Sequence, residues 1–231
     1  MLAALAVLLG VACASAGAES GTVRTLRATT STGRQGAFYV PAAHEPRPLP
    51  LAVFLHGTGG KGSLMLARVR AHAERDGFIV VAPDSASVAG VWTTVPTSED
   101  TRHVMASVRE VMTLPDLRVD RSHVLIAGFS VGGAVAARLA SQEDVFTAFA
   151  VLHGHVSTDA LGARRVRGWL STGDRDRVRT AAFTKDLAGQ LTARARFPSI
   201  ELRVFAGDHA LSDDELAALT AWWLRAGPRV P

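Results

Sequence analysis

The chain has 231 residues, of which 48% are hydrophobic and 20% are charged, and its formal net charge is +4. A chain of this length and apolar content can form one domain with a sizeable core. Most of the positive charge is carried by arginines that are interleaved with Asp and Glu, whereas a nucleic-acid-binding protein more often shows a basic stripe. We therefore expect no nucleic-acid partner.

The start of the chain has the features of a secretory signal peptide. An apolar run at 2–12 is too short to span a bilayer, and A-x-A cleavage patterns follow it at 14–16 and 16–18. We expect residues 1–18 to be removed and residues 19–231 to form a single domain of a secreted or periplasmic protein, with no stable membrane span. Lipoprotein anchoring through Cys13 is the alternative. Because Cys13 is the only cysteine, the mature chain would have no disulfide and no thiolate metal site.

Eight short apolar runs predict the strands of the domain, and several of them are apolar throughout, as parallel strands buried on both faces are. They lie at residues 23–28, 37–40, 51–55, 78–81, 124–129, 148–152, 169–171 and 202–205. Helical apolar spacing occurs at 99–113, 132–142 and 212–226, and the last of these begins with a Ser212–Glu215 capping box. The Pro-rich residues 41–50 indicate a surface loop.

The alternation of strands and helices predicts the α/β class, with a mostly parallel central sheet and helices on both faces. The first two strands are joined by too few residues for a crossover helix, so we expect an antiparallel hairpin at one edge. No insertion between the strands is long enough for a lid domain, and the site should therefore be open.

The strongest chemical signal is the G-x-S-x-G sequence from Gly128 to Gly132, which lies between a predicted strand and a predicted helix. In this context a sharp strand-to-helix turn exposes the hydroxyl of Ser130, and the flanking glycines avoid clashes at the turn. Ser130 then lies at a helix N-terminus, where backbone N–H groups can stabilise an oxyanion. We therefore expect Ser130 to be a nucleophile.

A serine nucleophile needs a base, and the base needs a carboxylate that fixes its tautomer. His209 is the candidate base because it follows the predicted strand 202–205 and precedes the last helix. Asp174 and Asp176 both follow the seventh predicted strand, and either could be the acid. The other would lie in a solvated turn or cap the helix that begins near Thr180. The chain order Ser, Asp, His is the order of α/β-hydrolases.

The residues after the third predicted strand, HGTGG at 56–60, let the backbone approach a substrate closely. The amide of Thr58, together with the amide of Val131, is the candidate oxyanion hole. The segment lacks the Lys-Ser/Thr ending of a P-loop and the G-x-G-x-x-G spacing, so no nucleotide is expected there.

Three further residues are candidates for the substrate pocket: His56, Trp92 and His153. A place in the core is the alternative for Trp92. No group of His, Cys, Asp and Glu in the sequence has metal-ligand spacing, so we expect neither a metal nor any other cofactor.

Several stretches resemble α/β-hydrolases, and above all the group of secreted polyhydroxyalkanoate depolymerases, feruloyl esterases and related carboxylesterases. They include LAVFLHGTGG, VDRSHVLIAGFSVGGAVAARLA, STGDRDRV and GDHALSDDELAALTAWWL, within roughly residues 36–226. In this group the acid lies in a G-x-x-D-x-V pattern, which Gly173, Asp176 and Val178 match. The resemblance therefore implies the α/β-hydrolase fold and favours Asp176 over Asp174 as the acid.

The same resemblance implies Ser130 as the nucleophile, His209 as the base and the residue after His56-Gly57 as an oxyanion donor. We expect a secreted serine hydrolase that cleaves carboxylic esters through an acyl-enzyme, acting on short-acyl, aryl or polyester-type substrates, small or polymeric. The alternatives are a peptidase on the same fold and a non-catalytic extracellular binding protein. The intact set of Ser130, Asp176 and His209 argues against the last of these.

Overall fold

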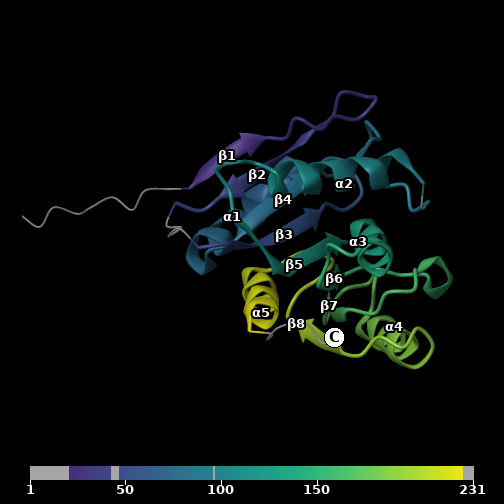
Figure 1. Cartoon of the computed structure of the whole chain (residues 1–231). Coiled ribbons are helices and arrows are strands. Elements are labelled where there is room, and N and C mark those ends of the chain that lie inside the picture. The colour runs from purple at the N-terminus through teal and green to yellow at the C-terminus, as the bar shows by residue number, and fades with distance from the viewer. Residues whose placement is uncertain (1–20, 43–46, 96, 226–231) are drawn as a thin grey trace, which may run out of the picture.

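The computed structural model describes residues 21–42, 47–95 and 97–225. The predicted signal peptide, Cys13 and the end of the last predicted helix lie outside these ranges. Within them, all eight predicted strands pair into one sheet in the order β1-β2-β4-β3-β5-β6-β7-β8 (Figure 1). The strands are β1 (Thr22–Thr25), β2 (Gly36–Val40), β3 (Leu49–Leu55), β4 (Ile79–Pro83), β5 (Val119–Phe129), β6 (Ala148–Leu152), β7 (Arg167–Gly173) and β8 (Ile200–Phe205).

The sheet is antiparallel at one edge and parallel elsewhere. β1 pairs with β2, and β2 with β4, in antiparallel fashion, whereas the pairs from β4 through β3, β5, β6 and β7 to β8 are parallel. The expected edge hairpin is therefore present. Its cause is the short β1–β2 connection, because a parallel pair needs a crossover of a dozen or more residues. This arrangement confirms the predicted α/β-hydrolase type of sheet.

Five α-helices lie within the described residues: α1 (Gly62–Asp76), α2 (Glu99–Met112), α3 (Val131–Gln142), α4 (Ala181–Ala193) and α5 (Asp213–Leu224). Side-chain N-caps fix the starts of three of them, because the hydroxyls of Ser98, Thr180 and Ser212 accept hydrogen bonds from backbone N–H groups in the first turns of α2, α4 and α5. α1 starts without a side-chain cap and ends at Gly77, whose φ of 72° suits glycine. The sequence patterns did not single out α1.

The helices cover both faces of the sheet, and two apolar clusters fill the space between these layers. Along β3, Leu51, Val53 and Leu55 belong to one cluster while Ala52 and Phe54 belong to the other, as the two-residue period of a strand requires. The first cluster includes residues of α2, α3 and α4, and the second includes residues of α1 and α5. A central sheet with both faces covered explains why strands such as β4 and β6 are apolar throughout.

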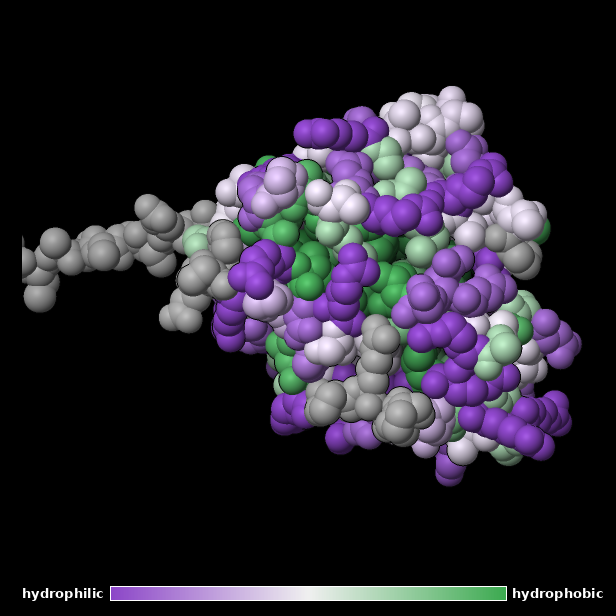
Figure 2. Space-filling view, in the orientation of Figure 1, coloured by the Kyte–Doolittle hydropathy of each residue, from purple (hydrophilic) through white to green (hydrophobic). Residues whose placement is uncertain are grey.

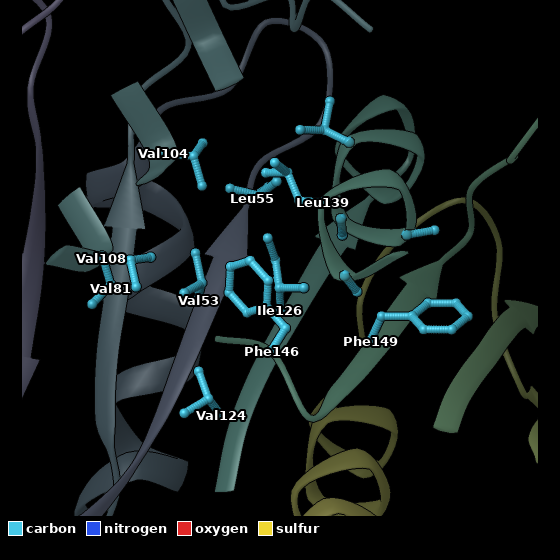
Figure 3. Close-up of a cluster of buried hydrophobic side chains, with 14 of the residues drawn as sticks. Val53, Leu55, Val81, Val104, Val108, Val124, Ile126, Leu139, Phe146 and Phe149 are labelled. Carbon is cyan, nitrogen blue, oxygen red and sulfur yellow. The ribbon is translucent and has the colours of Figure 1, made fainter. Parts of the chain in front are cut away.

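Figure 3 shows part of the first cluster, where Val104 and Val108 of α2 and Leu139 of α3 lie beside Val53 and Ile126 of the sheet. All five side chains have no exposed surface.

The face seen in Figure 2 is mainly hydrophilic, with hydrophobic residues visible in the gaps. No helix within the described ranges is long and apolar enough to cross a membrane.

The parallel strands β3 to β8 point the same way, so their carboxyl ends lie along one edge of the sheet. The loops that follow β3, β5, β6, β7 and β8 leave from this edge. In open α/β sheets, ligands bind outside the carboxyl ends of the strands. Every residue that the sequence singled out as a site candidate lies in these loops, in the loop after β4 or at the start of α3.

Candidate active site

Ser130 occupies a tight turn between the end of β5 and the start of α3. Its backbone has φ of 52° and ψ of −119°, which an L-residue adopts only at a cost in free energy. The turn is held because the Ser130 amide donates to the carbonyl of Leu152 at 2.8 Å. A side chain at Gly128 would collide with the backbone of Gly132, so the first glycine of the motif is required for this close approach. The local sequence thus builds a strained turn that presents the hydroxyl.

His209 connects Ser130 to a buried carboxylate. Its Nε2 lies 3.1 Å from Oγ of Ser130, and its Nδ1 lies 2.8 Å from Oδ2 of Asp176. The Asp176 side chain is fully buried, whereas 22% of the His209 side chain is exposed. The three residues come from loops after β5, β7 and β8, which the parallel sheet brings to one edge. This geometry allows a nucleophile, a base and an acid that orients the base.

Both oxygens of the Asp176 carboxylate accept hydrogen bonds, which hold the group in place. Oδ1 accepts from the amides of Val178 at 2.7 Å and Arg179 at 2.8 Å, and Oδ2 accepts from Thr172 Oγ1 at 3.3 Å in addition to His209. Burial alone would raise the pKa of Asp176, but the Arg179 amide, the imidazole contacts and the Val178 amide outweigh it and hold the pKa below its ordinary value. The group is therefore a permanent anion at neutral pH.

Asp174, the other candidate acid, occupies a different environment. It accepts a hydrogen bond from the Gly207 amide at 2.9 Å and forms an ion pair with Arg175 at 3.4 Å. About half of its side chain is exposed. The structure thus brings Asp176 to His209 and leaves Asp174 in a solvated turn.

The two candidate oxyanion donors belong to segments that meet at Ser130. Val131 is the first residue of α3, so its amide is among the N–H groups that an α-helix leaves without an intrahelical partner. A side chain at Gly57 would meet the ring of Phe129 and would lie 3.4 Å from Cβ of Ser130. The segment that carries Thr58 therefore packs directly against the turn, and the missing side chain at Gly57 allows this approach.

The side chains of His56 and Trp92 donate hydrogen bonds to backbone carbonyls of this segment. His56 is buried, its Nδ1 donates to the Gly57 carbonyl at 2.7 Å, and its Nε2 accepts from the Ser85 amide at 3.2 Å. This pattern requires a neutral imidazole, and burial correspondingly lowers the pKa of His56. Trp92 Nε1 donates to the His56 carbonyl at 2.7 Å. Asp100, which sequence reasoning gave no role, accepts from two amides of the loop that carries Ser85 and Trp92.

A cavity of about 270 Å³ lies beside His209, between its loop and α1. Leu64, Met65, Phe129 and Leu211 provide apolar walls, and Lys61 and Arg68 lie at its side. Of the three residues expected in the pocket, His56 lines this cavity, whereas Trp92 and His153 do not. Trp92 and His153 are 2% and 1% exposed, so packing has placed both in the interior.

His153 instead contacts the carboxylate of Asp176. The ligand atoms of His153, Asp176 and His209 lie within 4.8 Å of one another, close enough in principle to hold a metal ion. However, Nδ1 of His153 and Nδ1 of His209 each form a hydrogen bond with Oδ2 of Asp176. Sequence reasoning missed this grouping because the residues are far apart in the chain and come from three different loops.

Comparisons with known proteins agree with this architecture. The dienelactone hydrolase family matches residues 38–218 of the chain. The relative named "Putative esterase NocK", from Nocardia uniformis subsp. tsuyamanensis, is 33% identical over 151 residues, which cover 61% of this chain and 44% of that protein. This chain therefore spans less than half of the length of that relative.

Solved structures share the fold at low sequence identity. A fluorophosphonate-binding serine hydrolase of Staphylococcus aureus is 15% identical with a TM-score of 0.70, over 90% of this chain and 100% of that chain. A ferulic acid esterase of Anaeromyces mucronatus is 17% identical with a TM-score of 0.62, over 89% and 90%. An acylaminoacyl peptidase of Pyrococcus horikoshii is 15% identical with a TM-score of 0.71, over 92% and 43%. The resemblance to α/β-hydrolases is thus confirmed, and the chain belongs to the dienelactone hydrolase family.

Proposed function

We propose that this protein is a secreted serine hydrolase that cleaves carboxylic esters through an acyl-enzyme. The observation that carries the proposal is the hydrogen-bonded path from Ser130 through His209 to Asp176, with Ser130 on a strained turn at a helix N-terminus. A serine outside an active site has no need of such a turn, a neighbouring imidazole and a buried carboxylate at once.

The geometry supports the following chemistry. Ser130 Oγ attacks the carbonyl carbon of the ester while its proton passes to Nε2 of His209. The amides of Thr58 and Val131 hold the oxygen that becomes negative. His209 then gives the proton to the departing alcohol, which leaves an ester between the acyl group and Ser130. A water molecule attacks this acyl-enzyme by the same steps and releases the acid. Throughout, the anion of Asp176 keeps the Nδ1 proton of His209 in place.

The site favours short-acyl, aryl or polyester-type esters. His209 is partly exposed, and no insertion within the described residues covers the cavity beside it. The cavity has apolar walls but a volume of only about 270 Å³. A long acyl chain would therefore extend beyond the walls that could bury it, and each unburied methylene forgoes about 0.8 kcal/mol.

A peptidase is the second candidate, because an acylaminoacyl peptidase matches 92% of the chain with a TM-score of 0.71. The same Ser, His and Asp groups can cleave an amide. The two activities differ in the leaving group, which is an alcohol for an ester and an amine for an amide. A comparison of substrates therefore distinguishes them, whereas the residues of the site do not. Secretion is supported by the apolar run and cleavage patterns at the start of the chain.

The test is a hydrolysis screen over p-nitrophenyl esters of increasing length, feruloyl and hydroxybutyrate esters, and an aminoacyl-arylamide. Wild-type protein should cleave esters, and Ser130→Ala should lose several orders of magnitude in kcat. Ser130→Ala should also lose labelling by a fluorophosphonate probe while its Tm is retained. Cleavage of the arylamide alone would favour the peptidase, and no labelling of the folded wild type would favour a non-catalytic binding protein.

A further inference from the structure

A second imidazole, that of His153, contacts the same carboxylate oxygen of Asp176 as His209 does. His153 follows β6 and adopts a φ of 51°, which places it among the few non-glycine residues with positive φ in the described chain. Only 1% of its surface is exposed. Its amide donates to the Ser171 carbonyl at 2.7 Å, which holds the backbone of the loop against β7. Burial of an imidazole and a positive φ both cost free energy, so other contacts must stabilise His153.

Both ring nitrogens of His153 face carboxylates. Nδ1 lies 2.8 Å from Oδ2 of Asp176, which is the oxygen that His209 also contacts. Nε2 lies 3.2 Å from Oε2 of Glu215, a fully buried residue of α5. The other oxygen of Glu215 accepts from Ser171 Oγ at 2.5 Å. The capping-box glutamate of the sequence pattern is therefore used in the interior of the protein.

This arrangement fits a doubly protonated His153. An ionised carboxylate can only accept hydrogen bonds, so each nitrogen that faces one must donate. Burial by itself would lower the pKa of His153, but Glu215 and then Asp176 outweigh burial and raise the pKa above its ordinary value. The imidazolium is thus paired with two anions in a site that excludes water.

We propose that His153, held by Glu215, is a positioning residue that shares Oδ2 of Asp176 with His209 and thereby limits how strongly the carboxylate retains a proton on His209. This inference rests on the proposed function. Asp176 does not need His153 for its orientation, because the amides of Val178 and Arg179 already hold its other oxygen. The contribution of His153 is therefore its charge.

The physical effect follows from the distances. The ring centroids of His153 and His209 are 5.6 Å apart, so a positive charge on one opposes protonation of the other. A base that is kept free of its proton can accept the Ser130 proton at a lower pH. Among the described residues, the other charged or titratable side chains that line the cavity beside His209 are His56, Lys61 and Arg68, which the test leaves unchanged.

The decisive variant is the double substitution His153→Asn with Glu215→Gln, compared with wild type in kcat/KM from pH 5 to 9. Asn tolerates positive φ and keeps a neutral donor near Asp176, and Gln keeps an acceptor for Ser171. The acidic limb of the profile should move to higher pH by roughly half a unit to one unit, for a charge about 5.6 Å away partly offset by the lost Glu215 anion. His155→Asn, in the same loop but exposed beside Phe183, should leave the profile in place.

A drop in kcat/KM with an unmoved acidic limb would overturn the proposal, because a purely structural role changes the amount of active enzyme and not its titration. Nitrogen-15 NMR of the wild type gives a readout that needs neither activity nor a stable variant. The imidazole whose signals are lost in His153→Asn should keep protons on both nitrogens to a pH above the ordinary histidine pKa of roughly 6.5, and loss of that second proton at or below this pH would also overturn the proposal. Absence of Ser130-dependent hydrolysis would instead overturn the proposed function, on which the NMR signal does not depend.

Discussion

Replacing Asp176 by Asn should lower kcat, because it reverses the direction of the hydrogen bond between residue 176 and Nδ1 of His209. The amides of Val178 and Arg179 both donate to Oδ1 of Asp176, at 2.7 and 2.8 Å. An Asn that keeps its carbonyl oxygen there satisfies both of these N–H groups, but it no longer offers an acceptor to Nδ1 of His209 and of His153. Its NH₂ group then occupies the place of Oδ2 and faces Nδ1 of His209. A donor that faces this nitrogen favours the tautomer with the proton on Nε2, which cannot accept the Ser130 proton.

The expected loss in kcat is on the order of 10³–10⁴ for a wrong tautomer in such a triad. At 1.36 kcal/mol for each factor of ten, this corresponds to about 4–5.5 kcal/mol of transition-state stabilisation. Asp174→Asn is the matched control. Asp174 is half exposed and accepts one hydrogen bond from the Gly207 amide, which an Asn oxygen can also accept. Its kcat should stay within roughly threefold of the wild type.

The assay is the kcat for one good p-nitrophenyl ester, measured at pH 8 for wild type and both variants, with thermal unfolding of each as the control for folding. A folded Asp176→Asn variant with near-wild-type kcat would refute the reasoning about the tautomer. A larger loss for Asp174→Asn than for Asp176→Asn would move the acid to Asp174.

Further predictions concern the turn, the linkage to pH and the substrate. Gly128→Ala should destabilise the protein by on the order of 2–4 kcal/mol in urea unfolding, because its side chain would collide with the backbone of Gly132, whereas Gly189→Ala, in an open position on α4, should be neutral or stabilising. Hydrogen bonds lower the pKa of Asp176, so the stabilisation that they give is fully present above about pH 4 and should be lost as the pH falls below it. In Asp176→Asn, the free energy of unfolding should therefore fall less steeply at acidic pH. The raised pKa of His153 acts in the opposite sense, with stabilisation present below about pH 6.5 and lost as the pH rises through the raised value, and the double variant at His153 and Glu215 should lack this alkaline loss. The ratio of kcat/KM for butyrate and palmitate p-nitrophenyl esters should favour butyrate, without a jump at the micellar threshold and without an effect of EDTA; a preference for palmitate, a jump or a loss with EDTA would each contradict a separate part of the substrate proposal.

Much of the fold could be predicted because its signals are local. Strands buried on both faces, such as β4 and β6, must be apolar along their length, and all eight predicted runs are strands of the sheet. The short link between β1 and β2 left only a hairpin at that edge. The helix α1 was not predicted, although Met65, Leu66 and Val69 lie on its buried face. It shares the absence of a side-chain cap with α3, whose apolar spacing was recognised from the sequence.

The sequence by itself also singled out the two ends of the candidate site, Ser130 and His209, because each lies in a loop directly after a strand that the apolar pattern predicted. From the residues alone it left Asp174 and Asp176 as equal candidates; resemblance favoured Asp176. Only the tertiary structure shows Asp176 buried against His209 and Asp174 turned to solvent. The reason is that burial and hydrogen-bond partners depend on how β7 and β8 pair, which no local pattern records.

Local sequence patterns also could not predict the contact between His153 and Glu215. In the sequence one follows a strand and looks like a pocket residue, and the other belongs to a helix cap. They lie 62 positions apart in the chain, yet their side chains meet in the interior at 3.2 Å. Local sequence determines which segments form strands, helices and turns, since those depend on neighbouring residues. The partner of a buried charge is decided by the packing of segments that are distant in sequence, and that information appears only when the sheet and its covering helices are assembled.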